Sequence, residues 1–212
     1  VSLEGVIAAL EAETGLSAGY RRCGRVMTLP KPHLRDIALR HPQEALTNWH
    51  QQDRSFFWDV MDRTEISGWP ADDVTGSGIV FDTLAARVSP RALLTVLKAW
   101  LGRQQGVMID EACDTIDIDL RTGRATLPDG RTVSFDACLM ANGVAAFDFL
   151  DRLNGELRKP PVGVPVKGQA ALLDAKIDPT WPVIFYDGLY IIPHESGRVA
   201  IGSTSEDMFD EP

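Results

Sequence analysis

The sequence has few cysteines, a deficit of positive charge and no long apolar run, and each shortage argues against a class of protein. Cys23, Cys113 and Cys138 stand far apart and form no C-x-x-C pair, which argues against a zinc site or a disulfide framework. They indicate reduced thiols in a cytoplasmic protein. No segment approaches the roughly 18 consecutive apolar residues of a membrane-spanning helix. The four histidines lack metal-ligand spacing, so we expect no metal.

Acidic residues outnumber basic ones. The chain has 30 Asp and Glu against 21 Lys and Arg, which gives a net charge of -9. A nucleic acid needs a basic protein face, so this balance argues against such a partner. Hydrophobic residues make up 44% of the 212 positions, a content typical of a folded chain that can bury a sizeable core. Self-association into a homo-oligomer is left open.

The chain opens at Val1 rather than at a methionine and enters an amphipathic pattern at once. That pattern predicts a helix over residues 2–14, which Gly15 ends. The acidic stretch before Pro212 contains no closing element. We therefore expect the sequence to be part of a longer protein that extends beyond both ends.

The middle of the chain predicts a helix followed by strands. Ser89 is suited to cap a helix that begins at Pro90 and ends at Gly106, and the apolar residues 107–109 then predict a short strand. A helix that passes through a glycine into an apolar strand is typical of half a βαβ unit. Alternating residues next predict a three-stranded antiparallel meander over 115–119, 124–127 and 132–135.

A continuous apolar segment follows the meander and predicts a strand over 136–141, buried on both faces. It leads into Asn142-Gly143-Val144, which opens a short helix through Phe147 and Leu150. The other predicted elements are strands at 25–29, 78–83 and 183–186, a helical stretch near Pro42, a loop over 67–77, an extended segment over 162–173, and a hairpin of 189–192 with 198–201.

Three stretches together resemble the D-amino-acid oxidase family, and glycine oxidases most of all. The first is R-V-S-P-R-A-L-L at 87–94, and the second is the strand and turn at 136–144. The third contains P-V-K-G-Q at 165–169, Y-I-I-P at 190–193 and G-R-V-A-I-G-S-T at 197–204. The order and spacing of these stretches carry the resemblance over the last 125 or so residues.

The resemblance implies a mixed α+β and α/β fold with FAD as the cofactor. In such a two-domain protein, residues 87–150 would be the remnant of a Rossmann-like FAD domain with its β-meander. Residues 16–86 and 151–212 would form a substrate domain on a mixed sheet, and residues 1–15 a connecting helix. The family's G-x-G-x-x-G turn would precede Val1 and its carboxylate-binding arginine would follow Pro212. The chain alone is therefore expected to be inactive.

Family resemblance also implies which residues face the cofactor. The turn after the apolar strand would bring backbone N–H groups and a helix N-terminus to the diphosphate, because Gly143 has no Cβ. A strand bulge with a solvated lysine is the alternative for Lys167 and Gly168. The residues expected on the cofactor side are Thr115, Ala141, Asn142, Gly143, Val144, Lys167 and Gly168.

On the substrate side, the resemblance places Tyr190 over the flavin, where its phenol would hold the carboxylate of an amino acid. Phe185 and Tyr186 would wall the same pocket. Ser205 stands about where related sarcosine oxidases carry an oxygen-activating lysine, so the electron acceptor is left open. The family transfers a hydride from the substrate Cα to flavin N5, and water then hydrolyses the imine.

Two other functions are compatible with parts of this pattern. A nicotinamide-dependent dehydrogenase also uses βαβ units, but it is not expected to carry the meander or the P-V-K-G-Q segment. A truncated or degenerate family member could instead serve as a non-catalytic binding or assembly module. The sequence therefore predicts FAD-dependent oxidation of a small amine or amino acid by the complete protein, with that module as the alternative.

Overall fold

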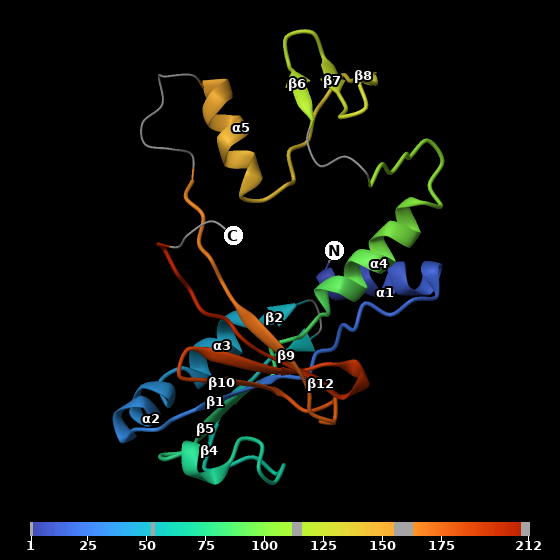
Figure 1. The fold of residues 1–212 in the computed structure, drawn as a ribbon. Helices are drawn as coiled ribbons and strands as arrows, with labels where there is room; N and C mark the ends of the chain where they lie inside the picture. The colour runs from blue at the N-terminus through green and yellow to red at the C-terminus, as the bar shows by residue number, and fades with distance from the viewer. Residues whose placement is uncertain (1, 52–53, 112–115, 155–162, 209–212) are drawn as a thin grey trace. The chain divides into compact units, whose positions relative to one another are not determined.

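The structure is a computed structural model that describes residues 2–51, 54–111, 116–154 and 163–208 (Figure 1). It divides into two compact units, which are described separately below. The larger unit contains Val1–Arg103 and Lys167–Glu206, and the smaller one contains Gln104–Val166 and Asp207–Pro212.

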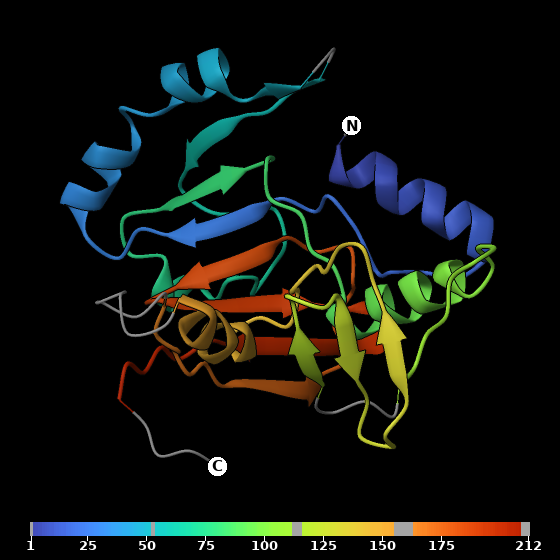
Figure 2. The ribbon, with the colours of Figure 1, turned by 90° about the horizontal axis from the view of Figure 1, so that it is seen from above.

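A seven-stranded mixed sheet forms the larger unit, with the strand order β4-β5-β1-β10-β11-β12-β9 (Figure 2). Strands β1 and β10 run parallel and every other neighbouring pair in this sheet runs antiparallel. The prediction that the extended segment up to residue 173 shares a sheet with residues 189–192 is confirmed, because β9 and β11 both pair with β12. The strands are β1 (Arg25–Thr28), β4 (Trp58–Met61), β5 (Ile79–Asp82), β9 (Ala170–Asp174), β10 (Val183–Tyr186), β11 (Leu189–Pro193) and β12 (Arg198–Gly202).

The two longest helices of the larger unit confirm the predicted stop at Gly15 and the predicted cap at Ser89. In α1 the Ser2 side chain accepts a hydrogen bond from the Gly5 N–H, and Gly15 ends the helix in the left-handed region. In α4 Ser89 accepts from Ala92 in the same way. The helical elements of this unit are α1 (Leu3–Thr14), α2 (Pro32–Ala38), α3 (Pro42–Asn48), η1 (Asp72–Val74), α4 (Pro90–Leu101) and η3 (Glu195–Gly197), and a small hairpin joins β2 (His50–Gln51) to β3 (Arg54–Ser55).

Two buried clusters hold this unit together. Helices α1 and α4 pack against each other through Ile7, Leu10 and Val96. The second cluster joins α2 to the sheet, where Ala38 packs with Leu29 and Val80. The Trp58 indole on β4 also donates to the Ala38 carbonyl at 3.0 Å. The helices thus fix the β4-β5-β1 side of the sheet.

The smaller unit contains a three-stranded antiparallel sheet and one helix. The sheet is β6 (Asp117–Asp119), β7 (Arg124–Thr126) and β8 (Thr132–Ser134), and the helix is α5 (Ala145–Asn154). This arrangement confirms the predicted meander and the predicted helix after Gly143.

Two predicted strands of the smaller unit are wrong. Residues 107–109 and 136–141 have an extended sequence pattern but belong to no strand, and Leu139 is 91% exposed instead of buried. A strand needs a neighbouring backbone to pair with, and none of the described strands pairs with either segment. Without such a partner, an apolar segment neither forms a ladder nor buries its side chains.

Helix lengths also differ from the prediction. Helix α4 ends at Leu101, and Gly106 lies beyond its end although its φ is 77°. The Gly102 N–H already bonds to the Lys98 carbonyl, so the helix closes there. The helical stretch predicted near Pro42 is two helices, α2 and α3, each beginning at a proline whose missing N–H costs nothing at that position.

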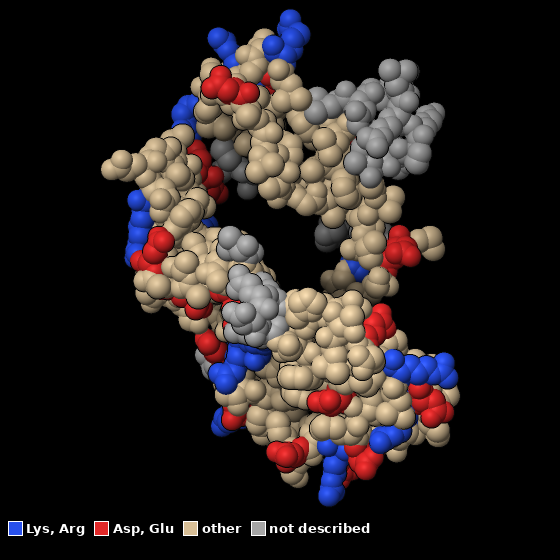
Figure 3. Space-filling view, turned by 180° about the vertical axis from the view of Figure 1, so that it is seen from behind, with Lys and Arg blue, Asp and Glu red and all other residues tan. Residues whose placement is uncertain are grey.

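In the view of Figure 3, lysine and arginine are interspersed with aspartate and glutamate and form no large patch of one sign. Within the part of the chain that the structure describes, no helix is long and apolar enough to cross a membrane. The described His, Cys, Asp and Glu side chains likewise form no group of three that could hold a metal ion.

Candidate active site

Tyr190 lies on β11 directly opposite Phe185 of β10 and Gly202 of β12. The rings of Tyr190 and Phe185 have centroids 4.9 Å apart at an angle of 50°, an arrangement typical of a favourable aromatic pair. Phe185 packs against one side of the Tyr190 ring, and Tyr190 as a whole is 37% exposed. The structure thus brings Phe185 and Tyr190 together, as predicted from the sequence.

The Tyr190 hydroxyl accepts a hydrogen bond of 3.3 Å from Nη1 of Arg25 on β1. The Nε of the same guanidinium lies 2.8 Å from Oδ2 of Asp82, the β5 residue directly opposite. Asp82 is only 1% exposed, and its Oδ1 accepts from the Ala85 N–H at 3.0 Å. The sheet therefore carries a chain of contacts from a buried carboxylate, through a cation, to an exposed phenol.

Local backbone geometry explains why Arg25 reaches Asp82. Gly24 has a φ of 73°, which side-chain-bearing residues rarely adopt, and a Cβ there would lie 2.8 Å from the Asp82 carbonyl oxygen. Only a glycine permits β1 to begin so close to the end of β5. The strand pairing then sets Arg25 opposite Asp82.

Tyr186 is placed differently from its neighbour. It ends β10 and pairs with Leu189, and alternate strand residues project from opposite faces of a sheet. Tyr186 therefore projects from the face opposite to Phe185 and Tyr190. Its role in the same substrate pocket stays a prediction.

Lys167, Gly168 and Ser205 gather at one short antiparallel bridge. The backbones of Lys167 and Glu206 exchange two hydrogen bonds, of 3.0 and 2.9 Å. A Cβ on Gly168 would lie 3.2 Å from the Thr204 carbonyl oxygen, which shows how closely the two backbones approach. Ser205 is exposed between Thr204 and Glu206. The close approach of the two backbones explains why a glycine stands at position 168. The cofactor-side role of Lys167 and Gly168 and the acceptor-side role of Ser205 stay predictions.

The turn predicted to face the diphosphate lies in the smaller unit. Ala141, Asn142, Gly143 and Val144 are exposed, and α5 follows them directly. Gly143 has a φ of 59°, and its carbonyl accepts the Ala146 N–H at 3.0 Å. An accessible helix N-terminus behind a glycine turn suits an anionic group, so these residues fit the predicted use. Thr115 lies outside the described residues.

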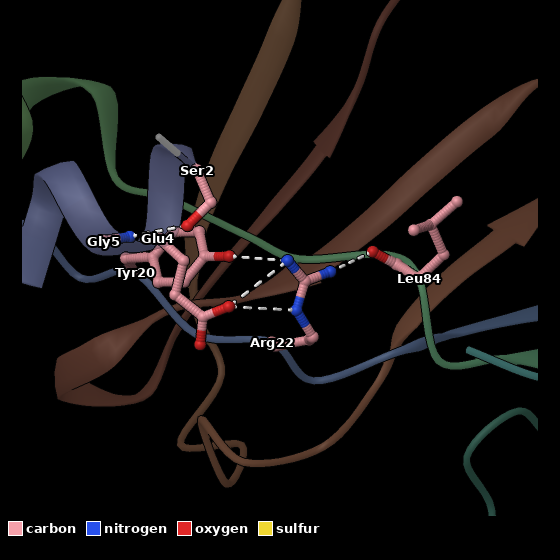
Figure 4. A network of polar contacts seen from close by, with 6 residues as sticks. All are labelled: Ser2, Glu4, Gly5, Tyr20, Arg22 and Leu84. Atoms are coloured by element: carbon pink, nitrogen blue, oxygen red, sulfur yellow. Dashed lines mark hydrogen bonds and ion pairs between the residues drawn. The ribbon is translucent and has the colours of Figure 1, made fainter. Parts of the chain in front are cut away.

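A second arginine of the larger unit forms a similar network near the start of α1 (Figure 4). Nε and Nη2 of Arg22 lie 3.5 Å from Glu4, and Nη2 also donates to the Tyr20 hydroxyl at 3.1 Å. Nη1 donates to the Leu84 carbonyl, and the guanidinium stacks over the Phe56 ring at 4.8 Å. This network attaches α1 to the segments that enter the sheet.

His194 follows β11 and is the described histidine with a displaced pKa. Burial lowers the pKa of its imidazole below the ordinary 6.5, and the positive charges of Arg87 and Arg198 lower it further. Arg87 is itself 5% exposed and donates to the carbonyls of Gly19 and Pro179, each at 3.0 Å. Protonating His194 would add a third positive charge to this region.

Sequence reasoning missed Arg25 and Asp82. Each had a local signal, because each places a charge at the end of an otherwise apolar strand. Their pairing could not be predicted from the sequence, because the two residues are 57 positions apart and meet only through the register of β1 and β5.

Comparisons with known proteins place the chain in a family. Residues 2–212 match the model of the family described as FAD dependent oxidoreductase. The bifunctional protein ThiO/ThiG of Synechocystis sp. is 27% identical over 215 residues, which cover 96% of this chain and 28% of that protein.

Solved structures share the fold. The glycine oxidase of Geobacillus kaustophilus superposes with a TM-score of 0.70 at 22% identity, over 98% of this chain and 54% of that one. The L-amino acid deaminase of Proteus myxofaciens, solved with anthranilate, gives 0.68 at 16% identity, over 94% of this chain and 44% of that one. The chain thus spans about half the length of these structures. The predicted resemblance and mixed fold are confirmed, and the chain belongs to the FAD-dependent oxidoreductase family.

Proposed function

We propose that the complete protein uses FAD to oxidise a small amine that carries a carboxylate, that is, an amino acid or a close relative. The observation that carries the proposal is the exposed residue Tyr190, whose ring packs on Phe185 and whose hydroxyl is hydrogen-bonded to Arg25 on a sheet of this family's fold. A phenol beside a cation is suited to binding a carboxylate.

The names of the structural neighbours support the substrate class. They include a glycine oxidase, an iminodiacetate oxidase, an L-amino acid deaminase and an L-proline dehydrogenase. Glycine, iminodiacetate, amino acids and proline all carry an amine and a carboxylate on one carbon. A shared carboxylate is the feature that the Tyr190 hydroxyl would recognise.

The protein's own part in the reaction is binding and orientation. FAD, when bound, supplies the acceptor for a hydride from the substrate Cα, and the resulting imine is hydrolysed by water. Tyr190 would fix the carboxylate and Phe185 would limit its approach, which sets the position of the Cα–H bond. The turn at 141–144 would hold the diphosphate of FAD through backbone N–H groups. Lys167 and Gly168 would lie on the cofactor side.

The predicted assignment of residues 87–150 to the FAD domain, with 16–86 and 151–212 in the substrate domain, is part of this proposal. So are the location in the cytoplasm and any self-association. Ser205 and Thr115 keep their predicted acceptor-side and cofactor-side roles, whereas a pocket role for Tyr186 would require it to act from the opposite face of the sheet.

The test is to purify the complete gene product and the 212-residue chain side by side. We expect the complete protein to carry stoichiometric flavin and to oxidise members of an amino-acid panel, as seen in the flavin spectrum and by product formation. The 212-residue chain, which spans about half of the structural neighbours, should bind FAD weakly or not at all. A colourless complete protein that oxidises no amine after incubation with FAD would contradict the proposal and favour a non-catalytic binding module.

A further inference from the structure

Arg25 occupies an unusual position in the larger unit, between a carboxylate without solvent access and an exposed phenol. Its Nε bonds to Asp82, which is 1% exposed, and its Nη1 bonds to Tyr190, which is 37% exposed. The arginine side chain itself is 25% exposed. It therefore joins the interior of the sheet to the surface that the proposed function assigns to the substrate.

The contact crosses a whole strand. Arg25 pairs with Val183 on β10, and Tyr190 pairs with Phe185 on the other side of β10, so the guanidinium reaches diagonally over this strand. Neighbouring strands are about 4.8 Å apart, so a long side chain is necessary to span the distance. A guanidinium can hold two partners at once because its N–H groups form a planar fork.

We propose that Arg25 is a positioning residue that orients the Tyr190 hydroxyl for a substrate carboxylate. A guanidinium only donates hydrogen bonds, so the Tyr190 oxygen must be the acceptor in their contact. The single phenolic proton then stays available to donate to another group. The positive charge of Arg25 beside the hydroxyl also favours an anion as the acceptor of this proton.

Asp82 keeps Arg25 in the required rotamer. Its buried carboxylate holds Nε from the β5 side, and its second oxygen is fixed by the Ala85 N–H. The guanidinium plane therefore has one favoured orientation. Because its Nη1 donates to the Tyr190 oxygen, it also fixes the direction in which the hydroxyl can donate. This inference rests on the proposed function, and it adds that Arg25 determines the preference for amines with a carboxylate over amines without one.

The experiment uses the FAD-loaded complete protein and three variants: Arg25→Lys, Tyr190→Phe and their combination. Lysine keeps the charge beside Asp82, so folding is retained, but its single ammonium cannot bridge Asp82 and Tyr190 in the same geometry. Arg22→Lys is the matched control, because Arg22 also joins a carboxylate to a tyrosine hydroxyl but lies in the α1 network. Melting temperatures verify that every variant is folded.

Two measurements distinguish a positioning role of Arg25 from a general loss of active-site structure. The first is kcat/KM on the best amino acid of the panel and on the amine obtained from it by decarboxylation. The second is the Kd of anthranilate and of aniline, which lacks the carboxylate, from the flavin absorbance change. Arg25→Lys should weaken kcat/KM on the amino acid and anthranilate binding by about tenfold, the scale of one charge-assisted hydrogen bond. The amine and aniline values should change less than about twofold.

The double variant decides the mechanism. If Arg25 acts through Tyr190, Arg25→Lys should have no further effect once Tyr190→Phe has removed the hydroxyl. Additive losses, or equal losses on substrates with and without a carboxylate, would overturn the positioning role. A protein that oxidises no amino acid would refute the proposed function instead. The anthranilate titration would then still test Arg25, and equal Kd values for the wild type and Arg25→Lys would overturn the inference.

Discussion

Two arginines three residues apart make the same kinds of contact in different surroundings. Arg22 and Arg25 each join a carboxylate to a tyrosine hydroxyl, through Glu4 and Tyr20 in one case and Asp82 and Tyr190 in the other. The Glu4 side chain is 33% exposed, whereas that of Asp82 is 1% exposed. The Arg22 network connects α1 to the segments that flank β1 and β5 (Figure 4), whereas the Arg25 network includes Tyr190 of the candidate active site.

The difference shows that an ion pair's role depends on where its carboxylate lies. The half-buried pair of Arg22 and Glu4 gains little, because water still reaches both side chains and screens their charges. A carboxylate without solvent must keep its cation, since an unpaired buried charge is costly. Arg25 is therefore held firmly enough to orient a third group, while Arg22 also depends on its carbonyl and aromatic contacts.

The largest expected effect comes from removing the two carboxylates in turn. Asp82→Ala should lower the free energy of unfolding of the complete protein by about 3–5 kcal/mol, the usual result of breaking a buried ion pair. Glu4→Ala, its matched control, should cost about 0–1 kcal/mol. Urea unfolding monitored by circular dichroism measures both. Equal losses would show that the exposure of the carboxylate does not govern the strength of these pairs.

A smaller effect is expected at the two tyrosines. Tyr190→Phe should lower kcat/KM on an amino acid by roughly 10–150-fold, because it removes one hydrogen bond to a charged group worth about 1.5–3 kcal/mol. The loss should nearly vanish on an amine that lacks the carboxylate. Tyr20→Phe should leave steady-state kinetics on both substrates unchanged. If Tyr190→Phe affected both substrates equally, Tyr190 would be a packing residue.

A third arginine, Arg87, extends the comparison, and the smallest expected effect is on the pH dependence of stability through its neighbour His194. Arg87 is buried and donates to carbonyls, and its charge lowers the pKa of His194, which burial already lowers below 6.5. Above about pH 6.5 the imidazole is neutral in both the folded and the unfolded chain, so its stabilising effect is fully present there. As the pH falls below this value the unfolded chain takes up a proton first, and stability decreases.

His194→Gln should therefore make the free energy of unfolding less dependent on pH between about 6.5 and 5. Unfolding by urea at several pH values in this window measures the slope for both proteins. The carboxyl groups of Asp119, Asp129 and Asp178, whose pKa values hydrogen bonds lower from 3.8, contribute at more acidic pH. Identical slopes for the wild type and the variant would show that burial and the neighbouring arginines do not lower the pKa of His194 in the folded chain.

Local signals predicted the elements that local forces form. Ser89 caps α4 and Gly15 ends α1 as expected, because each signal needs only a residue at the helix end and the adjacent turn. The meander and the hairpin of β11 and β12 were also predictable, since short connections bring consecutive strands together. The family resemblance, and not a local signal, suggested that Phe185 lies near Tyr190, and the antiparallel pairing of β10 with β11 sets these two residues opposite each other.

Predictions failed where an apolar segment needed a distant partner. Residues 107–109 and 136–141 have the composition of strands, and yet no described strand pairs with them. Apolar composition shows that a segment favours burial, but only a neighbouring backbone can complete its hydrogen bonds. For the same reason Asp82 could not be assigned to the candidate site from the sequence, because its carboxylate contacts Arg25 only when β1 lies beside β5.

The sequence by itself determined the helix caps, the turns, the alternation of strand faces and the motifs that identify the family. These features depend on contacts between residues close in the chain. Tertiary structure alone decided that Arg25 crosses β10 to join Asp82 to Tyr190. The reason is that strand order and register bring residues far apart in the chain within hydrogen-bonding distance, and no local pattern specifies them.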